Sequence, residues 1–187
     1  TQIWSGGVTF PRDLGLVNVG GKYLLTSKPV KEVEKLYGES KLMKNTEITK
    51  TKTIFSKTSF AKVPVEILLN FDVRDNNSTG EYYTIGYDNE NECFFADRTN
   101  ATSEEISENF PSMQIVPFVI NSGTTTWRIL VDTSSMEFFT SDGKVVITNV
   151  VYPSESFNQI EVFAENGKIN LIKARITELK SIWKTGK

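Results

Sequence analysis

The sequence predicts an all-β protein, an antiparallel β-sandwich of two sheets, from three observations. First, β-branched and aromatic residues are abundant, with 20 Thr, 16 Val, 15 Ile and 12 Phe, and these residues suit a pleated, half-buried surface. Second, short apolar runs separated by turn residues recur along the chain. Third, Asp142-Gly143 and Asn166-Gly167 are strong hairpin signals. The number of strands is enough for two sheets, which favours a sandwich over an up-and-down barrel.

The first 45 residues predict two smaller elements. Residues 8–28 resemble a hairpin, because two apolar segments flank Gly20-Gly21. Residues 29–37 predict one short helix, with Pro29 in its first turn and Gly38 after its end. We therefore divide the chain into a hairpin (1–28), a linker containing the helix (29–45) and the sandwich (46–187).

From about residue 46 onward, every predicted element is a strand. In the last strand, Ile172, Ala174 and Ile176 are expected to face the core. The predicted strands are Val65–Arg74, Tyr82–Tyr87, Glu92–Asp97, Gln114–Ile120, Trp127–Asp132, Glu137–Thr140, Val145–Val151, Gln159–Ala164 and Lys168–Ile176.

Composition excludes several classes of function. The 187 residues include 21 Lys and Arg and 23 Asp and Glu, a net charge of −2, so we expect neither nucleic acid nor an anionic membrane as a partner. No run approaches the roughly 20 apolar residues of a membrane span. There is no His and a single Cys, Cys93, which excludes His-dependent catalytic triads, His zinc sites and intrachain disulfides. We expect no cofactor.

Catalysis would therefore depend mainly on paired carboxylates, and the sequence offers several neighbours. Each has a structural alternative, because Asp in turns bonds its own backbone and most charged residues are solvated. Two segments rich in oxygen ligands, 75–78 and 88–92, lack the spacing of a calcium loop, so no metal site is predicted. The carboxylate candidates are Asp72 with Asp75, Asp88 with Glu90 and Glu92, and Asp132 with Glu137.

Aromatic side chains are the candidates for sugar binding, because a ring face packs against the apolar face of a sugar. Tyr82 and Tyr83 must point to opposite faces of one strand, so one of the two can be exposed. Trp127 alternates with Ile129 and Val131 and is expected in the core. The sugar-binding candidates are therefore Tyr82 and Tyr83.

Two motifs about 100 residues apart resemble glycoside hydrolase family 32, the invertases, inulinases and levanases. The stretch from Val131 to Gly143, running on to Thr148 and Tyr152-Pro153, resembles the family's VDxSSxExFxNDG…T…YP signature in its C-terminal sandwich. Phe10–Leu16 looks like the family's PREL-x-L stretch, and the helix region looks like its Q-P-V-x-E-L-E-x-L stretch. The signature positions that we assign to structure are Arg12, Asp132, Ser134, Ser135, Glu137, Phe139 and Gly143.

What this resemblance implies is mainly structural. The family's active site lies in an N-terminal five-bladed β-propeller, with motifs of the WMNDPNG, RDP and EC types. No WMNDPNG is present, Arg12-Asp13 lies at the PREL position and Glu92-Cys93 lies inside the sandwich, so we assign no catalytic residue. In the signature segment, Asp132 is expected to bond Ser134 and Ser135 in the turn. Glu137 and Phe139 should share a strand face opposite Phe138.

The resemblance also predicts partners. The chain begins at Thr1 and looks like a piece of a longer protein, so the expected partner is its own N-terminal propeller. Residues 1–28 would be the propeller's last hairpin, and residues 1–30 would dock on the sandwich or self-associate. The parent would hydrolyse levan, inulin or sucrose in a secreted, periplasmic or cell-surface setting. The alternative function is a fructan-binding module, since family 32 sandwiches are similar to lectin and concanavalin folds.

Overall fold

The computed structural model describes residues 9–56, 64–69, 73–76, 80–121, 124–165 and 167–180. Within them the chain forms fourteen strands and one 3-10 helix. The elements are β1 (Arg12–Val19), β2 (Lys22–Pro29), η1 (Lys31–Leu36), β3 (Tyr37–Ile48), β4 (Lys52–Ser56), β5 (Val65–Leu69), β6 (Val73–Asn76), β7 (Tyr82–Asp88), β8 (Cys93–Asp97), β9 (Met113–Pro117), β10 (Trp127–Asp132), β11 (Ser135–Thr140), β12 (Val146–Val150), β13 (Gln159–Val162) and β14 (Ile169–Leu179).

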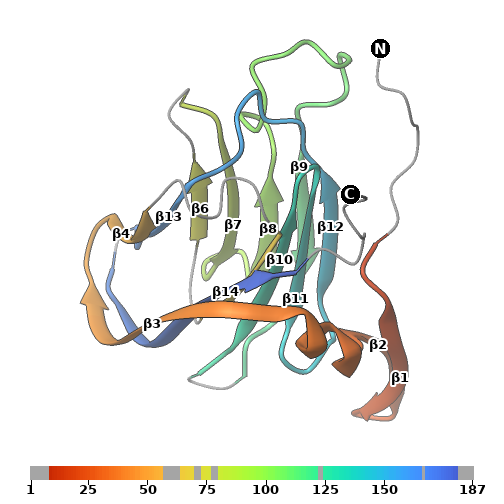
Figure 1. Cartoon of the computed structure of the whole chain (residues 1–187). Coiled ribbons are helices and arrows are strands. Elements are labelled where there is room, and N and C mark those ends of the chain that lie inside the picture. The colour runs from red at the N-terminus through yellow and green to blue at the C-terminus, as the bar shows by residue number, and fades with distance from the viewer. Residues whose placement is uncertain are drawn as a thin grey trace.

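Two six-stranded sheets make up the predicted sandwich, and β1 and β2 form a separate two-stranded sheet beside it (Figure 1). The first sheet has the order β12-β11-β10-β5-β14-β3, and the second has the order β4-β13-β6-β7-β8-β9. All the pairings given for these sheets are antiparallel. The prediction of an all-β, two-sheet antiparallel fold is therefore confirmed.

The main core fills the space between the two sheets. Phe94 of the second sheet lies between Trp127 and Phe138 of the first, with ring centroids 5.6 and 5.4 Å away. Trp127 is 1% exposed, so its predicted place in the core is confirmed. Phe138 faces this core while Phe139 joins a second cluster on the outer face of the first sheet, as the alternation of the strand predicts.

The N-terminal hairpin turns at Gly20-Gly21, as predicted. Asn18 pairs with Tyr23 and Val19 with Lys22 around a two-residue turn. Gly20 and Gly21 have φ angles of 58° and 85°, the combination that a type I′ turn requires and that glycine adopts without strain. The local sequence is therefore sufficient to fix this hairpin.

The helix region differs from its prediction. Residues 31–36 form a 3-10 helix, and Gly38 does not end it, because β3 begins at Tyr37 and pairs with β14 as far as Ile48. A side chain at Gly38 would meet the Glu178 carbonyl oxygen at 3.2 Å. Strand pairing with β14 thus extends the first sheet nine residues before the predicted start of the strands.

Two further strand predictions were wrong in detail. The apolar run from Val65 is divided into β5 in the first sheet and β6 in the second, so the chain changes sheets within it. In β14, Ile172 is 50% exposed although Ala174 and Ile176 are buried. Asn45 of the paired strand β3 has a φ of 45°, and this local irregularity accompanies the break in the in-out alternation of β14.

The predicted Asn166-Gly167 turn includes Asn166, which lies outside the described residues.

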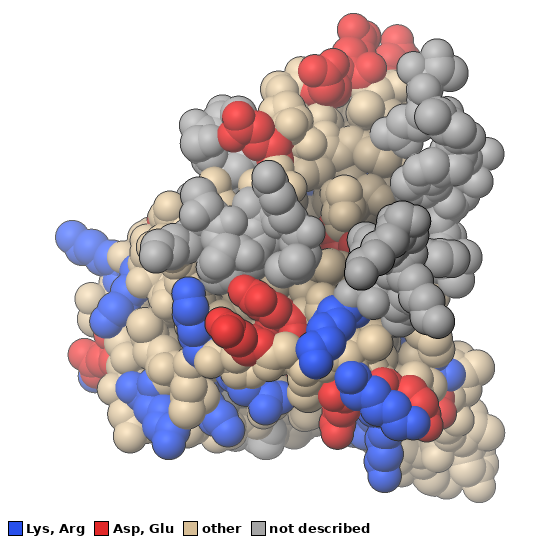
Figure 2. Space-filling view, viewed as in Figure 1, with Lys and Arg blue, Asp and Glu red and all other residues tan. Residues whose placement is uncertain are grey.

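Charge is unevenly distributed over the face drawn in Figure 2. Lys and Arg gather over its lower part, where β3 crosses in Figure 1. β3 is an edge strand of the first sheet and carries Lys41 and Lys44 on exposed positions. Lysine on an edge strand opposes pairing with a second sheet.

Among the described residues, no helix has the length and apolar character of a membrane span.

Candidate functional site

The signature residues meet where the hairpin contacts the outer face of the first sheet. Arg12 of β1 donates from Nη2 to Glu137 Oε2 at 2.5 Å and to Thr148 Oγ1 at 2.7 Å. The Glu137 side chain is 1% exposed, and its other oxygen accepts the Phe10 backbone N–H at 2.7 Å. A carboxylate buried this deeply needs such partners, because an unpaired buried charge is strongly unfavourable. The ion pair therefore ties two segments 125 residues apart.

Backbone hydrogen bonds and one ring contact reinforce this joint, the contact between the hairpin and the sandwich around Arg12 and Glu137. Ser27 of β2 donates its N–H to the Gly143 carbonyl at 2.9 Å, and Val30 donates to Pro11 at 3.0 Å. The Arg12 guanidinium carbon lies 5.1 Å from the centre of the Phe139 ring, within the range of a cation–π contact. Arg12, Glu137 and Phe139 thus form one contact, as their shared signature suggests.

The Asp142-Gly143 turn is the part of the sandwich that contacts β2 of the hairpin at this joint. Gly143 has a φ of 74°, and a Cβ there would lie 2.8 Å from Lys28 Cγ and 3.0 Å from the Ser27 carbonyl oxygen. Glycine is required both by this left-handed backbone and by the closeness of the hairpin.

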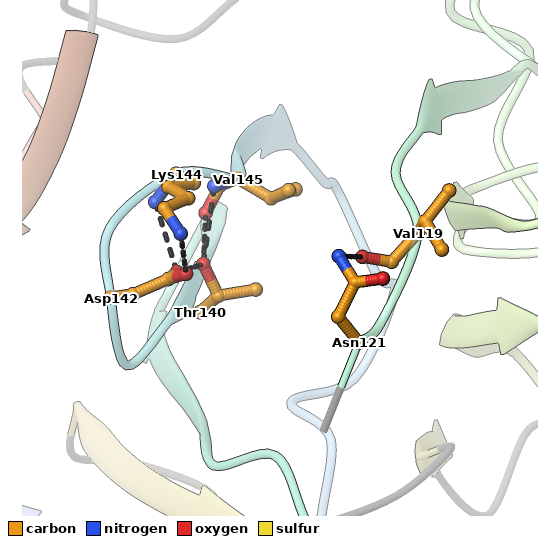
Figure 3. A network of polar contacts seen from close by, with 6 residues as sticks. All are labelled: Val119, Asn121, Thr140, Asp142, Lys144 and Val145. Atoms are coloured by element: carbon orange, nitrogen blue, oxygen red, sulfur yellow. Dashed lines mark hydrogen bonds and ion pairs between the residues drawn. The ribbon is translucent and has the colours of Figure 1, made fainter. Parts of the chain in front are cut away.

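Asp142 holds the turn from within (Figure 3). It accepts a hydrogen bond from Thr140 Oγ1 at 2.7 Å and lies 3.1 Å from Lys144 Nζ. Partial burial raises the pKa of Asp142. The hydrogen bonds from Thr140 and Lys144 and the charge of Lys144 lower it by more than burial raises it, so the pKa lies below its ordinary value.

Helix η1 covers the outer face of the first sheet next to the joint. Val33 is 3% exposed and packs in a cluster with Leu130, Phe139 and Leu179. Phe10 and Val30 pack against the same cluster. Apolar burial and the ion pair therefore act together where the chain passes from hairpin to sandwich.

A second buried ion pair lies on the same outer face. Glu66 is fully buried, forms a hydrogen-bonded ion pair with Arg128, and has Arg175 Nη2 3.7 Å away. Arg128 also donates to the Tyr37 hydroxyl at 3.2 Å. Burial, together with the Glu66 carboxylate, raises the pKa of Tyr37 to about 12. The sequence analysis missed this group, because Glu66 lies inside an apolar run and no local pattern connects it with Arg128 or Tyr37.

A groove of about 800 Å³ runs between the hairpin and the open side of the sandwich. Two buried polar atoms of lining residues, Arg12 Nε and Ser27 Oγ, have no hydrogen-bond partner in the described part of the chain. Beside it the hairpin leaves Leu14 70% and Leu25 62% exposed. Other residues that line the groove are Ile115, Val146 and Thr148.

The two predicted sugar-binding tyrosines lie away from this groove. Tyr83 is 1% exposed in the main core, and its hydroxyl accepts a 2.7 Å hydrogen bond from Asn149. Tyr82 is half-buried and accepts a 2.8 Å bond from Asn100. The alternation of the strand is as predicted, and only Tyr82 has accessible ring surface.

The other signature positions belong to the β10–β11 turn. In the described chain, the Asp132 carboxylate accepts hydrogen bonds from the N–H and hydroxyl of Thr133, so the expected contacts with Ser134 and Ser135 were wrong. Ser134 instead accepts the Val151 N–H through its carbonyl at 2.9 Å. Ser135 pairs in register with both Asp132 and Val150. Backbone pairing therefore occupies these positions.

Several of the candidate carboxylates have structural partners in the described residues. Asp88 accepts the N–H groups of Glu90 and Asn91 at 2.9 and 3.0 Å, which is the turn-forming role of Asp. Glu137 faces Arg12 rather than Asp132. Asp72 lies outside the described residues, as do residues 77 and 78. Within the described chain, no three His, Cys, Asp or Glu side chains are placed to hold a metal ion.

Together these features define a class, a two-sheet antiparallel β-sandwich domain with an N-terminal hairpin fixed to its outer face. The family model described as "Glycosyl hydrolases family 32 C terminal" matches residues 32–178, and the chain belongs to this family.

Curated relatives are fructan-degrading enzymes by name. The chain is 28% identical to a levanase of Bacillus subtilis (strain 168) over 99% of its own length, and 24% identical to an extracellular exo-inulinase of Aspergillus awamori over 98%. It spans 29% and 36% of the length of these relatives.

Solved structures share the fold. The chain is similar to exo-inulinase from Aspergillus awamori, with a TM-score of 0.78 and 22% identity over 94% of this chain and 36% of that one. It is also similar to fructan 1-exohydrolase IIa from Cichorium intybus, with a TM-score of 0.68 and 17% identity over 92% of this chain and 41% of that one.

Proposed function

We propose that this chain is the non-catalytic C-terminal domain of a hydrolase acting on levan, inulin or sucrose, and that it braces an N-terminal β-propeller. The observation that carries this proposal is the buried Arg12–Glu137 pair. This ion pair fastens the hairpin to the sandwich, so a propeller that contained the hairpin would be held against the sandwich. The levanase and inulinase names of the relatives supply the substrate class.

In this proposal residues 1–28 complete the last propeller blade and the bracing sandwich follows the linker, starting with β3 at Tyr37 and not at the predicted residue 46. Exposed apolar residues on the hairpin support it, with Leu14, Leu16 and Tyr23 each 70–72% exposed. Exposed apolar surface next to a strand edge favours burial against a partner.

Hydrolysis itself is assigned to two carboxylates of the propeller, with retention of configuration. The conspicuous carboxylates of this chain have structural partners, since Glu137 faces Arg12 and Glu66 faces Arg128. A nucleophile and general acid of a retaining glycosidase need carboxylates about 5–5.5 Å apart and free to react. We therefore expect no release of fructose from sucrose, inulin or levan by this chain alone.

A chimera tests the bracing role. The C-terminal part of the Bacillus subtilis levanase is replaced by this chain, and the half-life of levan hydrolysis is measured at rising temperature. The chimera should outlast the truncated levanase, and Leu16→Asp on the hairpin should shorten its half-life several-fold. Ile172→Asp, which changes a similarly exposed residue of the sandwich, is the control and should have no effect.

Two outcomes would contradict this proposal. One is a chimera no more durable than the truncated levanase. The other is fructose release by the purified chain that disappears on substitution of one of its own carboxylates, for example Asp13→Asn or Glu92→Gln.

A further inference from the structure

A hollow of about 510 Å³ lies on the outer face of the second sheet, lined by residues of β8, β9 and the end of β7. Phe95 of β8 pairs directly with Gly86 of β7. A Cβ at Gly86 would lie 2.2 Å from Phe95 Cζ. The ring therefore leans across the sheet onto the glycine backbone. Phe95 is half-buried, so the part of its ring that does not contact Gly86 lines the hollow.

The walls of this hollow are unequal in polarity. On the β9 side Met113 and Ile115 are 51% and 59% exposed. On the other side are Asp88 and Asn91. A single aromatic face is thus bounded by aliphatic carbon on one side and by carboxylate and amide groups on the other.

The polar wall is fixed in place before any ligand binds. Asp88 Oδ1 accepts two backbone N–H groups, and Oδ2 accepts Asn91 Nδ2 at 2.7 Å. The side-chain and backbone hydrogen bonds from Asn91 lower the pKa of Asp88, so the carboxylate stays an acceptor. A ligand that donates hydroxyl groups would meet acceptors that need no reordering, and pre-organisation favours binding.

We propose that this hollow binds a neutral oligosaccharide, with one sugar packed on the Phe95 ring and its hydroxyl groups directed to Asp88 and Asn91. A sugar is the ligand that offers C–H groups on one face and hydroxyl groups at its edge. An anionic sugar is opposed by the Asp88 charge. An apolar protein segment would remove the Asp88 charge from water without adding a hydrogen-bond partner to it, at a desolvation cost that one ring does not offset.

The position of Ile115 gives the direction in which a longer chain extends. Ile115 lines both this hollow and the groove beside the hairpin. A polysaccharide crossing β9 at Ile115 would pass from the Phe95 ring into that groove, past Leu14 and Leu25 of the hairpin. The binding surface therefore suits a polymer better than a monosaccharide.

Titration of the ¹⁵N-labelled chain with oligosaccharides from levan and inulin tests the proposal by NMR. We expect amide shifts in β7, β8, β9 and the turn between β7 and β8, and longer oligosaccharides should extend the shifts to the residues that line the groove. Phe95→Leu keeps apolar volume over Gly86 but removes the ring face, and should weaken binding about tenfold, the equivalent of an aromatic contact. Ile115→Asp should abolish binding, whereas Ile172→Asp, at a position 50% exposed on the opposite sheet, should leave it unchanged.

Three results would overturn the proposal: no shifts with either oligosaccharide, shifts that map elsewhere, or equal binding of polygalacturonate. Concentration-dependent dimerisation abolished by Ile115→Asp would also overturn it, because a second copy of the chain would then cover the hollow. None of these results affects the bracing role, because the chimera experiment depends on the hairpin and not on Phe95.

Discussion

At the scale of single residues, the outer face of the first sheet depends on charges that are buried rather than solvated. Glu137 and Glu66 each face an arginine from another segment. The sequence analysis placed Glu137 on the right strand face from its alternation with Phe138, but assigned it no partner. The partner is 125 residues away, and neither local periodicity nor turn chemistry reports a contact over that separation.

The ion pair leads to the first prediction. Glu137→Ala leaves Arg12 unpaired and should reduce the free energy of unfolding by about 3 kcal/mol, as expected when one member of a buried pair is removed. Glu47→Ala breaks the exposed pair of Glu47 with Lys168, whose side chains are 52% and 66% exposed, and should cost less than 1 kcal/mol. Urea denaturation measures both, and equal losses would show that the Arg12 contact contributes little.

Two glycines with similar backbone angles give the second prediction. Gly20→Ala has nothing within 4 Å of the new Cβ, so its cost is the left-handed φ alone, about 1 kcal/mol. Gly143→Ala adds a clash with Lys28 and Ser27 and should cost more, and it should also release the hairpin to trypsin. Thermal melting and limited proteolysis compare them. If both variants resist trypsin equally, the turn is not what holds the hairpin.

At the scale of elements, regular strands were predictable and their junctions were not. The alternation in β10 and β11 and the Gly20-Gly21 turn are local features, and local features gave the correct faces and register. The 31–36 region carries a helical apolar spacing, but the 3-10 helix ends where Tyr37 pairs with Leu179. Tertiary pairing thus overrode local propensity.

Tyr37 at this junction gives the third prediction. Its pKa is raised to about 12 by burial and by the neighbouring Glu66 carboxylate, from an ordinary value of 10.0. The folded state keeps the phenol protonated while the unfolded state loses the proton, so stability should be full below pH 10 and fall as pH rises towards 12. Tyr37→Phe should flatten this decline in urea midpoints, and Tyr23→Phe, at an exposed position, should not. Parallel declines in the parent and Tyr37→Phe would refute the assignment.

At the scale of the whole molecule, composition and spacing predicted two antiparallel sheets, which the structure has. The Phe95 hollow was not predictable, because it arises from the pairing of a glycine with a phenylalanine across two strands. The hairpin joint was predictable only as a set of signature positions. Its geometry needs the three-dimensional meeting of Arg12, Glu137 and Thr148.

The fourth prediction concerns the independence of the sandwich. Removing residues 1–28 should leave a cooperative fold, because the main core lies between the two sheets and contains no hairpin residue. The shortened chain loses Arg12, so Glu137 becomes an uncompensated charge and stability should fall by about 2–3 kcal/mol. Glu137→Gln should therefore change the free energy of unfolding in opposite directions in the full chain and in the shortened chain. It destabilises the full chain by breaking the ion pair and stabilises the shortened chain by removing the charge. Urea denaturation of the four proteins measures this sign change. A shortened chain that fails to unfold cooperatively would show that the hairpin belongs to the sandwich core, and an equal loss in both contexts would show that Arg12 does not compensate Glu137.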